Sequence, residues 1–391
     1  MQIILNSWHV LSSALVFTIG LFVALFLSRR YAVYPQKAIL LYLWHTIFCF
    51  LYLFYSLYNQ ADSIGYYKRS LTFDWSISLG TDSVDAFSAI FSQGLGFSYL
   101  GLFLVFNIIG FIGFLAFYAV LSYITLGAPS YITRISTVII FLPSVSFWSS
   151  ALGKDAFSFM SVGLALWASL DLKRYIWLMV FAIVLMLIVR PHMSGLMVIA
   201  LSLALFFQPG ASPVQRFLYS LVAAGGAILL VPLALSYAGV GGDAQVSDLV
   251  EYIEQRQKEN LDGASSVDIN NMSLVVKLFT YFFRPLPFEA HNFAALAASL
   301  DNVVLLLMLF LSLRLVLKRK NFQTDIDKSG RIFLWTYSFS AWVILSMTTA
   351  NLGIAMRQKW MFAPMLIVLT LSALSRAYKS DRILRSNPRL S

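Results

Sequence analysis

One stretch of the sequence, SYLGLFLVFNIIGFIGFLAFYAVL at residues 98–121, decides the fold because it contains no charged side chain. A membrane-spanning helix needs about 20 mostly apolar residues, since hydrocarbon offers no hydrogen-bond partner to the backbone. The rest of the 391-residue chain agrees, with 59% hydrophobic and only 12% charged residues, whereas soluble domains carry roughly 25% charged residues. The sequence therefore predicts an all-α, polytopic integral membrane protein.

The same apolar pattern recurs along the chain and predicts about eleven transmembrane helices. The expected spans are residues 8–28, 38–58, 98–121, 134–150, 156–171, 175–189, 193–208, 217–237, 292–315, 332–350 and 360–376.

The distribution of charge predicts the orientation. Most of the 28 Lys and Arg fall on the cytoplasmic side if the N-terminus is outside and the C-terminus is cytoplasmic. Residues 1–391 then form a single membrane domain with two large outer loops, 59–97 and 238–291, and a basic cytoplasmic tail, 377–391. The net charge of +10 is thus explained by topology and by attraction to anionic membrane lipids, not by nucleic-acid binding.

Three shorter elements are expected in the outer loops. A short amphipathic helix over Val84–Phe91 is capped by Thr81-Asp82. Residues 246–260 predict a polar helix in water, and Ser273–Phe283 predicts an interfacial or re-entrant segment.

Several function classes lack the residues that they need. Cys49 is the one cysteine, and the four histidines lack metal-ligand spacing, so we expect no disulfide and no metal. The sequence also contains no phosphate-binding Walker loop and no dinucleotide fingerprint. We expect no cofactor.

Charged residues at the outer ends of the short spans are the candidate functional groups, because charge near hydrocarbon is costly. Pro191 breaks the helix between Arg190 and His192, and snorkelling of Arg190 to lipid headgroups is the alternative explanation. Lys154 and Asp155 lie in the turn before the fifth span, where a local ion pair is the alternative.

Two further groups lie before the ninth and the last spans. In Arg284-Pro285-Leu286-Pro287-Phe288-Glu289 two prolines forbid helix and hold Arg284 and Glu289 in a fixed loop. Arg357 and Lys359 are either ligands or topological anchors. Asp62 begins the first outer loop, where an exposed carboxylate is otherwise simply solvated.

Taken together, these groups predict a basic hollow on the outer side of the membrane that binds a phosphorylated lipid. Guanidinium groups bind phosphate bidentately and ammonium groups supply point charges. The expected diphosphate-binding residues are Arg190, Arg284, Arg357, Lys154 and Lys359. The aromatic residues Tyr66, Tyr67 and Trp148 are expected to stack on sugar rings, although an interfacial aromatic belt needs no ligand.

Four stretches resemble bacterial polysaccharide polymerases of the Wzy type. They are FLPSVSFWSSALGKDAF (Phe141 to Phe157), the Arg190-Pro191-His192 turn, FRPLPFEA (Phe283 to Ala290) and NLGIAMRQKWMFAP (Asn351 to Pro364). The resemblance implies a GT-C-like glycosyltransferase of the bacterial cytoplasmic (inner) membrane that acts without metal on its outer face. Its substrates would be oligosaccharide repeat units linked to undecaprenyl diphosphate, and a chain-length regulator protein would be a partner.

The resemblance also implies that Arg190, Arg284 and Arg357 hold the diphosphate. The candidate catalytic bases are Asp62, Asp155, Glu289 and His192, in that order of preference. Asp62 comes first by analogy with other lipid-phosphosugar glycosyltransferases. Two main alternatives remain: a GT-C enzyme that adds one sugar from a polyprenyl-phosphate donor, and a lipid-linked glycan transporter, which should show internal symmetry. A glycan acyltransferase is a third, for which the sequence shows no compelling His-centred site.

Overall fold

The computed structural model describes most of the chain, and every regular element in this part is helical. Helices make up 81% of the structure, and no β-strand occurs in the part that is described. The all-α prediction is therefore confirmed. The described residues are 3–59, 61–75, 78–237, 267, 269, 272–290, 293–318 and 326–386.

The chain divides into two compact units. Unit 1 comprises Met1–Ala119, Val145–Trp167 and Trp177–Ser194, and unit 2 comprises Val120–Ser144, Ala168–Ile176 and Gly195–Ser391. Each unit combines segments that are distant in sequence. The prediction of a single membrane domain stays a prediction, because two compact units can belong to one such domain.

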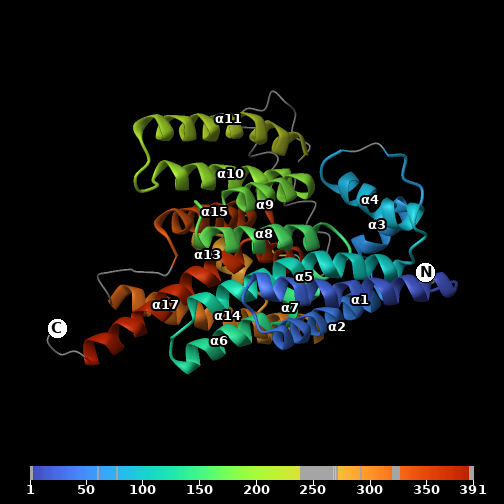
Figure 1. The fold of residues 1–391 in the computed structure, drawn as a ribbon, viewed down its shortest axis with the longest axis horizontal. Helices are drawn as coiled ribbons and strands as arrows, with labels where there is room; N and C mark the ends of the chain where they lie inside the picture. The colour runs from blue at the N-terminus through green and yellow to red at the C-terminus, as the bar shows by residue number, and fades with distance from the viewer. Residues whose placement is uncertain are drawn as a thin grey trace. The chain divides into compact units, whose positions relative to one another are not determined.

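Unit 1 is built mainly from the N-terminal helices. Figure 1 shows α1 and α2 running side by side in blue, with the short helices α3 and α4 next to each other. The helices that lie wholly or mostly in this unit are α1 (Ser7–Arg30), α2 (Pro35–Tyr58), α3 (Asp62–Ser70), α4 (Thr81–Ala89), α5 (Tyr99–Ile124), α7 (Pro143–Ser149), α8 (Lys154–Leu170) and α9 (Ile176–Val189).

Glycines let α5 lie in backbone contact with its neighbours in unit 1. A Cβ atom added to Gly163 of α8 would lie 2.2 Å from the carbonyl oxygen of Gly113, and one added to Gly110 would lie 1.9 Å from that of Ser149. Small residues of this kind allow close packing where helices cannot gain from the hydrophobic effect in lipid. Residues 98–119 of the stretch that decides the fold thus lie at the buried centre of the unit.

Unit 2 contains the remaining helices. Within it α13 packs on α15, where the Trp342 indole N–H donates to the carbonyl of Leu278 at 3.0 Å, and α14 packs on α17. Its helices are α6 (Ser130–Ile140), α10 (Pro191–Phe206), α11 (Pro213–Tyr237), α13 (Leu274–Phe283), α14 (Phe293–Lys318), α15 (Lys328–Thr348), α16 (Leu352–Gln358) and α17 (Ala363–Ser386), of which α10 begins in unit 1.

Each of the eleven predicted spans coincides with one or more of these helices, but fewer of the described helices are both long enough and apolar enough to cross a membrane. Five helical stretches of the described chain have the necessary length and apolarity, or six if the bent pair Leu352–Met361 and Ala363–Arg376 is one span. Helices α9 and α10 are apolar but shorter. The structure therefore supports a membrane protein, with five or six helices of membrane-spanning length among the described residues, while the eleven-span topology, its orientation and its loops stay predictions. The five are Ser7–Arg30, Pro35–Tyr58, Tyr99–Ile124, Ser130–Ser149 and Ala295–Ser312.

The smaller elements agree with expectation in part. Helix α4 lies where the amphipathic helix was predicted, but its N-cap is Gly80 and not the Thr81-Asp82 pair. Glycine suits this place because its φ of +90° is strained for other residues. Helix α13 covers the predicted segment Ser273–Phe283 except its first residue, and the polar helix predicted at 246–260 lies outside the described residues.

Candidate functional site

Unit 1 contains an open cavity of about 970 Å³, which we call the basic cavity. This volume is at the upper end of that found for small-molecule sites. Three basic residues and one acid are among its lining residues, so its formal charge is positive. The lining consists of Leu57, Tyr58, Asn59, Ala61, Asp62, Ile64, Gly65, Tyr66, Lys68, Arg69, Thr81 and Lys154.

Helix α3 supplies most of the charged residues of the lining. Asp62 is its first residue, where a carboxylate is favoured by the helix dipole, and Lys68 and Arg69 lie in its last turn, where cations are favoured. Asp62, Tyr66 and Arg69 are spaced i, i+4 and i+7, so they share one face of the helix. The structure thereby brings three predicted site residues, Asp62, Lys154 and Tyr66, to one cavity.

An ion pair next to the basic cavity holds α3 against α4. The Arg69 Nε donates to Asp85 at 2.6 Å, and its guanidinium lies 5.1 Å from the centre of the Tyr66 ring. The Arg69 side chain is 50% exposed, whereas that of Asp85 is 2% exposed. Burial raises the pKa of the Asp85 carboxyl, and the hydrogen bond from Arg69 offsets part of this effect. Neither Arg69 nor Asp85 was among the predicted site residues.

A second ion pair joins two residues to which the sequence assigned different roles. Arg190 donates to Asp155 Oδ1 at 2.7 Å and to Ser158 Oγ at 3.1 Å. Arg190 occupies the break between α9 and α10 that was predicted at Pro191, and Pro191 is the first residue of α10. Because the Arg190 side chain is only 10% exposed and that of Asp155 only 9%, snorkelling of Arg190 is excluded. The predicted diphosphate ligand is already bound to a predicted base.

The predicted sugar-stacking residues of unit 1 lie in or against its aromatic core. Tyr66 is 4% exposed. The Tyr67 hydroxyl donates to the carbonyl of Phe97 at 3.3 Å, and the Trp148 ring contacts Tyr52. Their sugar-stacking role stays a prediction. So does the catalytic role of His192, which is half-buried in the first turn of α10.

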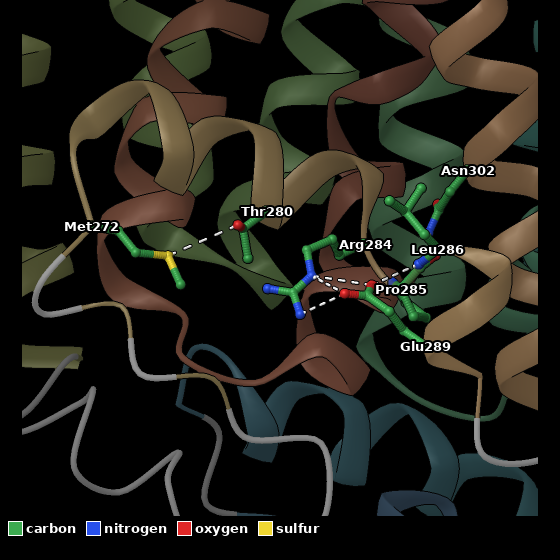
Figure 2. Close-up of polar contacts among 7 residues, drawn as sticks. All are labelled: Met272, Thr280, Arg284, Pro285, Leu286, Glu289 and Asn302. Atoms are coloured by element: carbon green, nitrogen blue, oxygen red, sulfur yellow. Dashed lines mark hydrogen bonds and ion pairs between the residues drawn. The ribbon is translucent and has the colours of Figure 1, made fainter.

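In unit 2 the loop after α13 forms a third ion pair, shown in Figure 2. The Arg284 Nε donates to Glu289 Oε1 at 2.8 Å, and the Leu286 N–H donates to Glu289 Oε2 at 2.8 Å. The two side chains are 28% and 22% exposed. The expected fixed loop is present, but the expectation that its prolines forbid helix is wrong. A 3₁₀ turn begins at Pro287, because proline is accepted at a first helical position.

Lys359, a predicted diphosphate ligand, lies in a sealed polar cluster of unit 2. Its ammonium group donates to Asn302 Oδ1, and Asn302 Nδ2 donates to the carbonyl of Pro285 at 3.0 Å. Asp301 interacts electrostatically with Lys359 and accepts hydrogen bonds from the backbone N–H and the hydroxyl of Ser144. Lys359 and Asp301 are each 1% exposed. We call these residues the sealed cluster.

Asp301 and a second buried network were not predicted from the sequence. An acid inside an apolar span is itself a functional signal, and Asp301 lies within the predicted span 292–315. In unit 1 the His45 ring contacts Asn107 at 2.6 Å and Ser149 Oγ at 2.9 Å. This network links α2, α5 and α7, and polar residues within the spans were its signal.

The three arginines that were predicted to share one hollow do not all belong to one unit. Arg190 belongs to unit 1, whereas Arg284 and Arg357 belong to unit 2, so a hollow shared by all three stays a prediction. Arg357 lies half-buried in the last turn of α16. Within the described ranges there is no group of three His, Cys, Asp or Glu residues that could hold a metal ion.

Comparison with known proteins gives no relative: no family model, no curated protein and no solved structure matches this chain.

Proposed function

We propose that this chain is a membrane glycosyltransferase that polymerises oligosaccharide repeat units linked to undecaprenyl diphosphate. The reaction would take place on the outer face of the bacterial cytoplasmic membrane, as a step in surface polysaccharide biosynthesis. The observation that carries the proposal is the basic cavity, where the predicted base Asp62 and the predicted diphosphate ligand Lys154 line the same space. Lys68 and Arg69 add two cations to that lining.

The chemistry needs an oxyanion to be stabilised and a proton to be accepted. A hydroxyl oxygen of the acceptor sugar attacks the anomeric carbon of the donor, whose bond to the diphosphate oxygen breaks. The leaving diphosphate takes the electron pair, and preorganised cations stabilise its charge without a metal. Asp62 would accept the hydroxyl proton. The three basic side chains of the cavity supply the cations.

Asp62 is preferred to two of the other candidate bases on geometric grounds. The side chains of Asp155 and Glu289 are only 9% and 22% exposed, so a substrate hydroxyl reaches them less easily. Asp62 is exposed at the cavity. Arg284 and Arg357 are kept as candidate diphosphate ligands of unit 2.

The experiment is complementation of a strain that lacks this gene, with the polymer and the lipid-linked intermediates as readouts. We expect Asp62→Asn to lower chain extension about 100-fold or more, the scale of a lost general base, and to accumulate single repeat units at normal protein levels. The control is Asp82→Asn, at an exposed acid of the same loop outside the cavity lining.

Each alternative predicts a different result. Truncated repeat units would identify a transferase that adds one sugar from a polyprenyl phosphate. Repeat units confined to the inner leaflet would identify a transporter. A normal polymer ladder with Asp62→Asn would contradict the assignment of the base.

A further inference from the structure

Helix α2 carries an apolar stripe that ends at the basic cavity. Phe50, Leu53 and Phe54 line a groove of about 800 Å³ together with Ile3, Ile4, Leu5 and Leu100. Leu57 and Tyr58 line the basic cavity. Positions 50, 53, 54, 57 and 58 have the i, i+3, i+4, i+7, i+8 spacing of one helix face. The groove, which we call the α2 groove, and the basic cavity therefore follow one another along the same face of one helix.

The two spaces differ sharply in chemistry. Every residue that lines the α2 groove is aliphatic or aromatic. Of its lining residues, Leu53 is 1% exposed and Phe54 is 53% exposed. The basic cavity has three cations and one carboxylate. An apolar channel that leads to a cationic cavity is complementary to a molecule with a long hydrocarbon chain and an anionic end.

We infer that the α2 groove holds the hydrocarbon chain of a single long-chain lipid phosphate whose anionic head lies in the basic cavity. The identity of the occupant rests on the proposed function, which makes it the polyprenyl chain of the diphosphate-linked substrate. Hydrocarbon packed on Phe50 and Phe54 fixes the depth of the molecule in the membrane. Lys68, Arg69 and Lys154 line the cavity where the apolar stripe of α2 ends. Their positive charges would bind the phosphates of the lipid there.

The apolar stripe of α2 differs from ordinary lipid-facing surface in that it leads to the basic cavity. Helix α1 also exposes phenylalanines, such as Phe26 at 72%, but Phe26 lines neither the groove nor the cavity. Annular lipid would cover both helices alike. A specific lipid phosphate would occupy α2 and depend on the cations at its end.

The test uses the full chain in nanodiscs and a radiolabelled, photoreactive undecaprenyl diphosphate, with labelled peptides mapped by mass spectrometry. We expect labelling at residues 50–58 and 3–5. Phe54→Ala should weaken probe affinity about tenfold, the scale of losing a partly buried aromatic contact. Phe26→Ala is the matched control and should bind as wild type. Lys68→Ala should also weaken labelling. This variant tests the cationic end of the site without changing the residues that line the groove.

Two competing probes identify the source of the lipid. The corresponding undecaprenyl alcohol, which lacks phosphate, and a photoreactive phosphatidic acid, which has two acyl chains, should each label the groove weakly. Equal labelling by phosphatidic acid, or labelling spread equally over α1 and α2, would overturn the inference in favour of annular lipid. Unchanged labelling with Phe54→Ala would overturn it as well.

The inference and the proposed function fail in different ways. Probe binding that requires Phe54 and Lys68, in a strain where Asp62→Asn still makes full polymer, would retain the lipid site and reject the catalytic assignment. Loss of polymer with Asp62→Asn, combined with labelling outside the groove, would retain the enzyme and reject the site.

Discussion

The two units hold lysine in opposite environments. Lys154 of unit 1 lines an open cavity, whereas Lys359 of unit 2 is 1% exposed and bonded within the sealed cluster. The sequence assigned both residues the same role. A buried cation surrounded by protein acceptors mainly maintains the fold, since removal of its partner leaves an uncompensated charge. A cation at an open cavity remains accessible to an anionic ligand. Exposure therefore separates the candidate ligands better than residue type does.

The largest effect is expected in the sealed cluster. Lys359→Met should lower the free energy of unfolding by about 4 kcal/mol, because the buried Asp301 carboxylate loses its nearby positive charge and Asn302 Oδ1 loses its donor. The double variant Lys359→Met with Asp301→Asn should recover most of that loss. Lys154→Met is the matched control and should change stability by less than about 1 kcal/mol. Equal losses of stability in the two lysine variants, measured by unfolding in one detergent, would contradict the distinction between a structural lysine in unit 2 and an accessible lysine in unit 1.

The Arg190–Asp155 pair of unit 1 should come next, because both side chains are almost as well buried as the sealed cluster. Either Arg190→Met or Asp155→Asn alone should cost about 3 kcal/mol of stability. In a double-mutant cycle, the stability loss of the double variant should be clearly smaller than the sum of the two single losses. Additive losses would show that the pair is not energetically coupled, and Arg190 would again be open to a role in binding phosphate.

The Arg284–Glu289 pair should show a smaller effect, since water reaches both side chains. Glu289→Gln keeps an acceptor for the Leu286 N–H but removes the charge, and it should cost about 1 kcal/mol. Thermal unfolding of this variant and of Asp155→Asn under the same conditions checks the order of the two pairs. A loss from Glu289→Gln that exceeds the loss from Asp155→Asn would reverse the order and contradict the argument from exposure.

The smallest effect is the pH dependence contributed by Asp85 beside the basic cavity. Burial raises the pKa of its carboxyl above the ordinary value near 4, so the folded protein binds this proton more tightly than the unfolded chain does. Its contribution to stability should therefore fall as the pH rises from about 4 through the raised value. Unfolding midpoints of wild type and Asp85→Asn, compared across that range, should diverge in this direction. A difference that stays constant with pH would rule out the shift.

The helices could be predicted from sequence because hydrocarbon demands long apolar stretches, and these are visible without a structure. The number of these helices that span the membrane could not be predicted in the same way. Helix α9 has 14 residues, and at 1.5 Å per residue it reaches only about 21 Å of a roughly 30 Å core. An apolar segment between two breaks does not reveal whether it crosses the membrane or packs within the protein.

The candidate site was predictable where its residues are neighbours in sequence. Arg284 and Glu289 are five residues apart, and the prolines between them indicated a fixed loop. The Arg190–Asp155 pair joins residues 35 positions apart, and Lys359 bonds to Asn302 across 57. Such contacts depend on how helices pack, which hydropathy does not encode. The Arg69–Asp85 pair was missed for the same reason, because it forms between two short helices.

The central claim is that the basic cavity binds the phosphates of the lipid. Binding of undecaprenyl diphosphate to the purified chain in nanodiscs tests it most directly. The account predicts that Lys154→Ala raises the Kd about tenfold or more, which corresponds to about 1.4 kcal/mol, and that Arg284→Ala has a smaller effect. Wild-type affinity for Lys154→Ala, together with a large loss for Arg284→Ala, would contradict the account and move the site to unit 2.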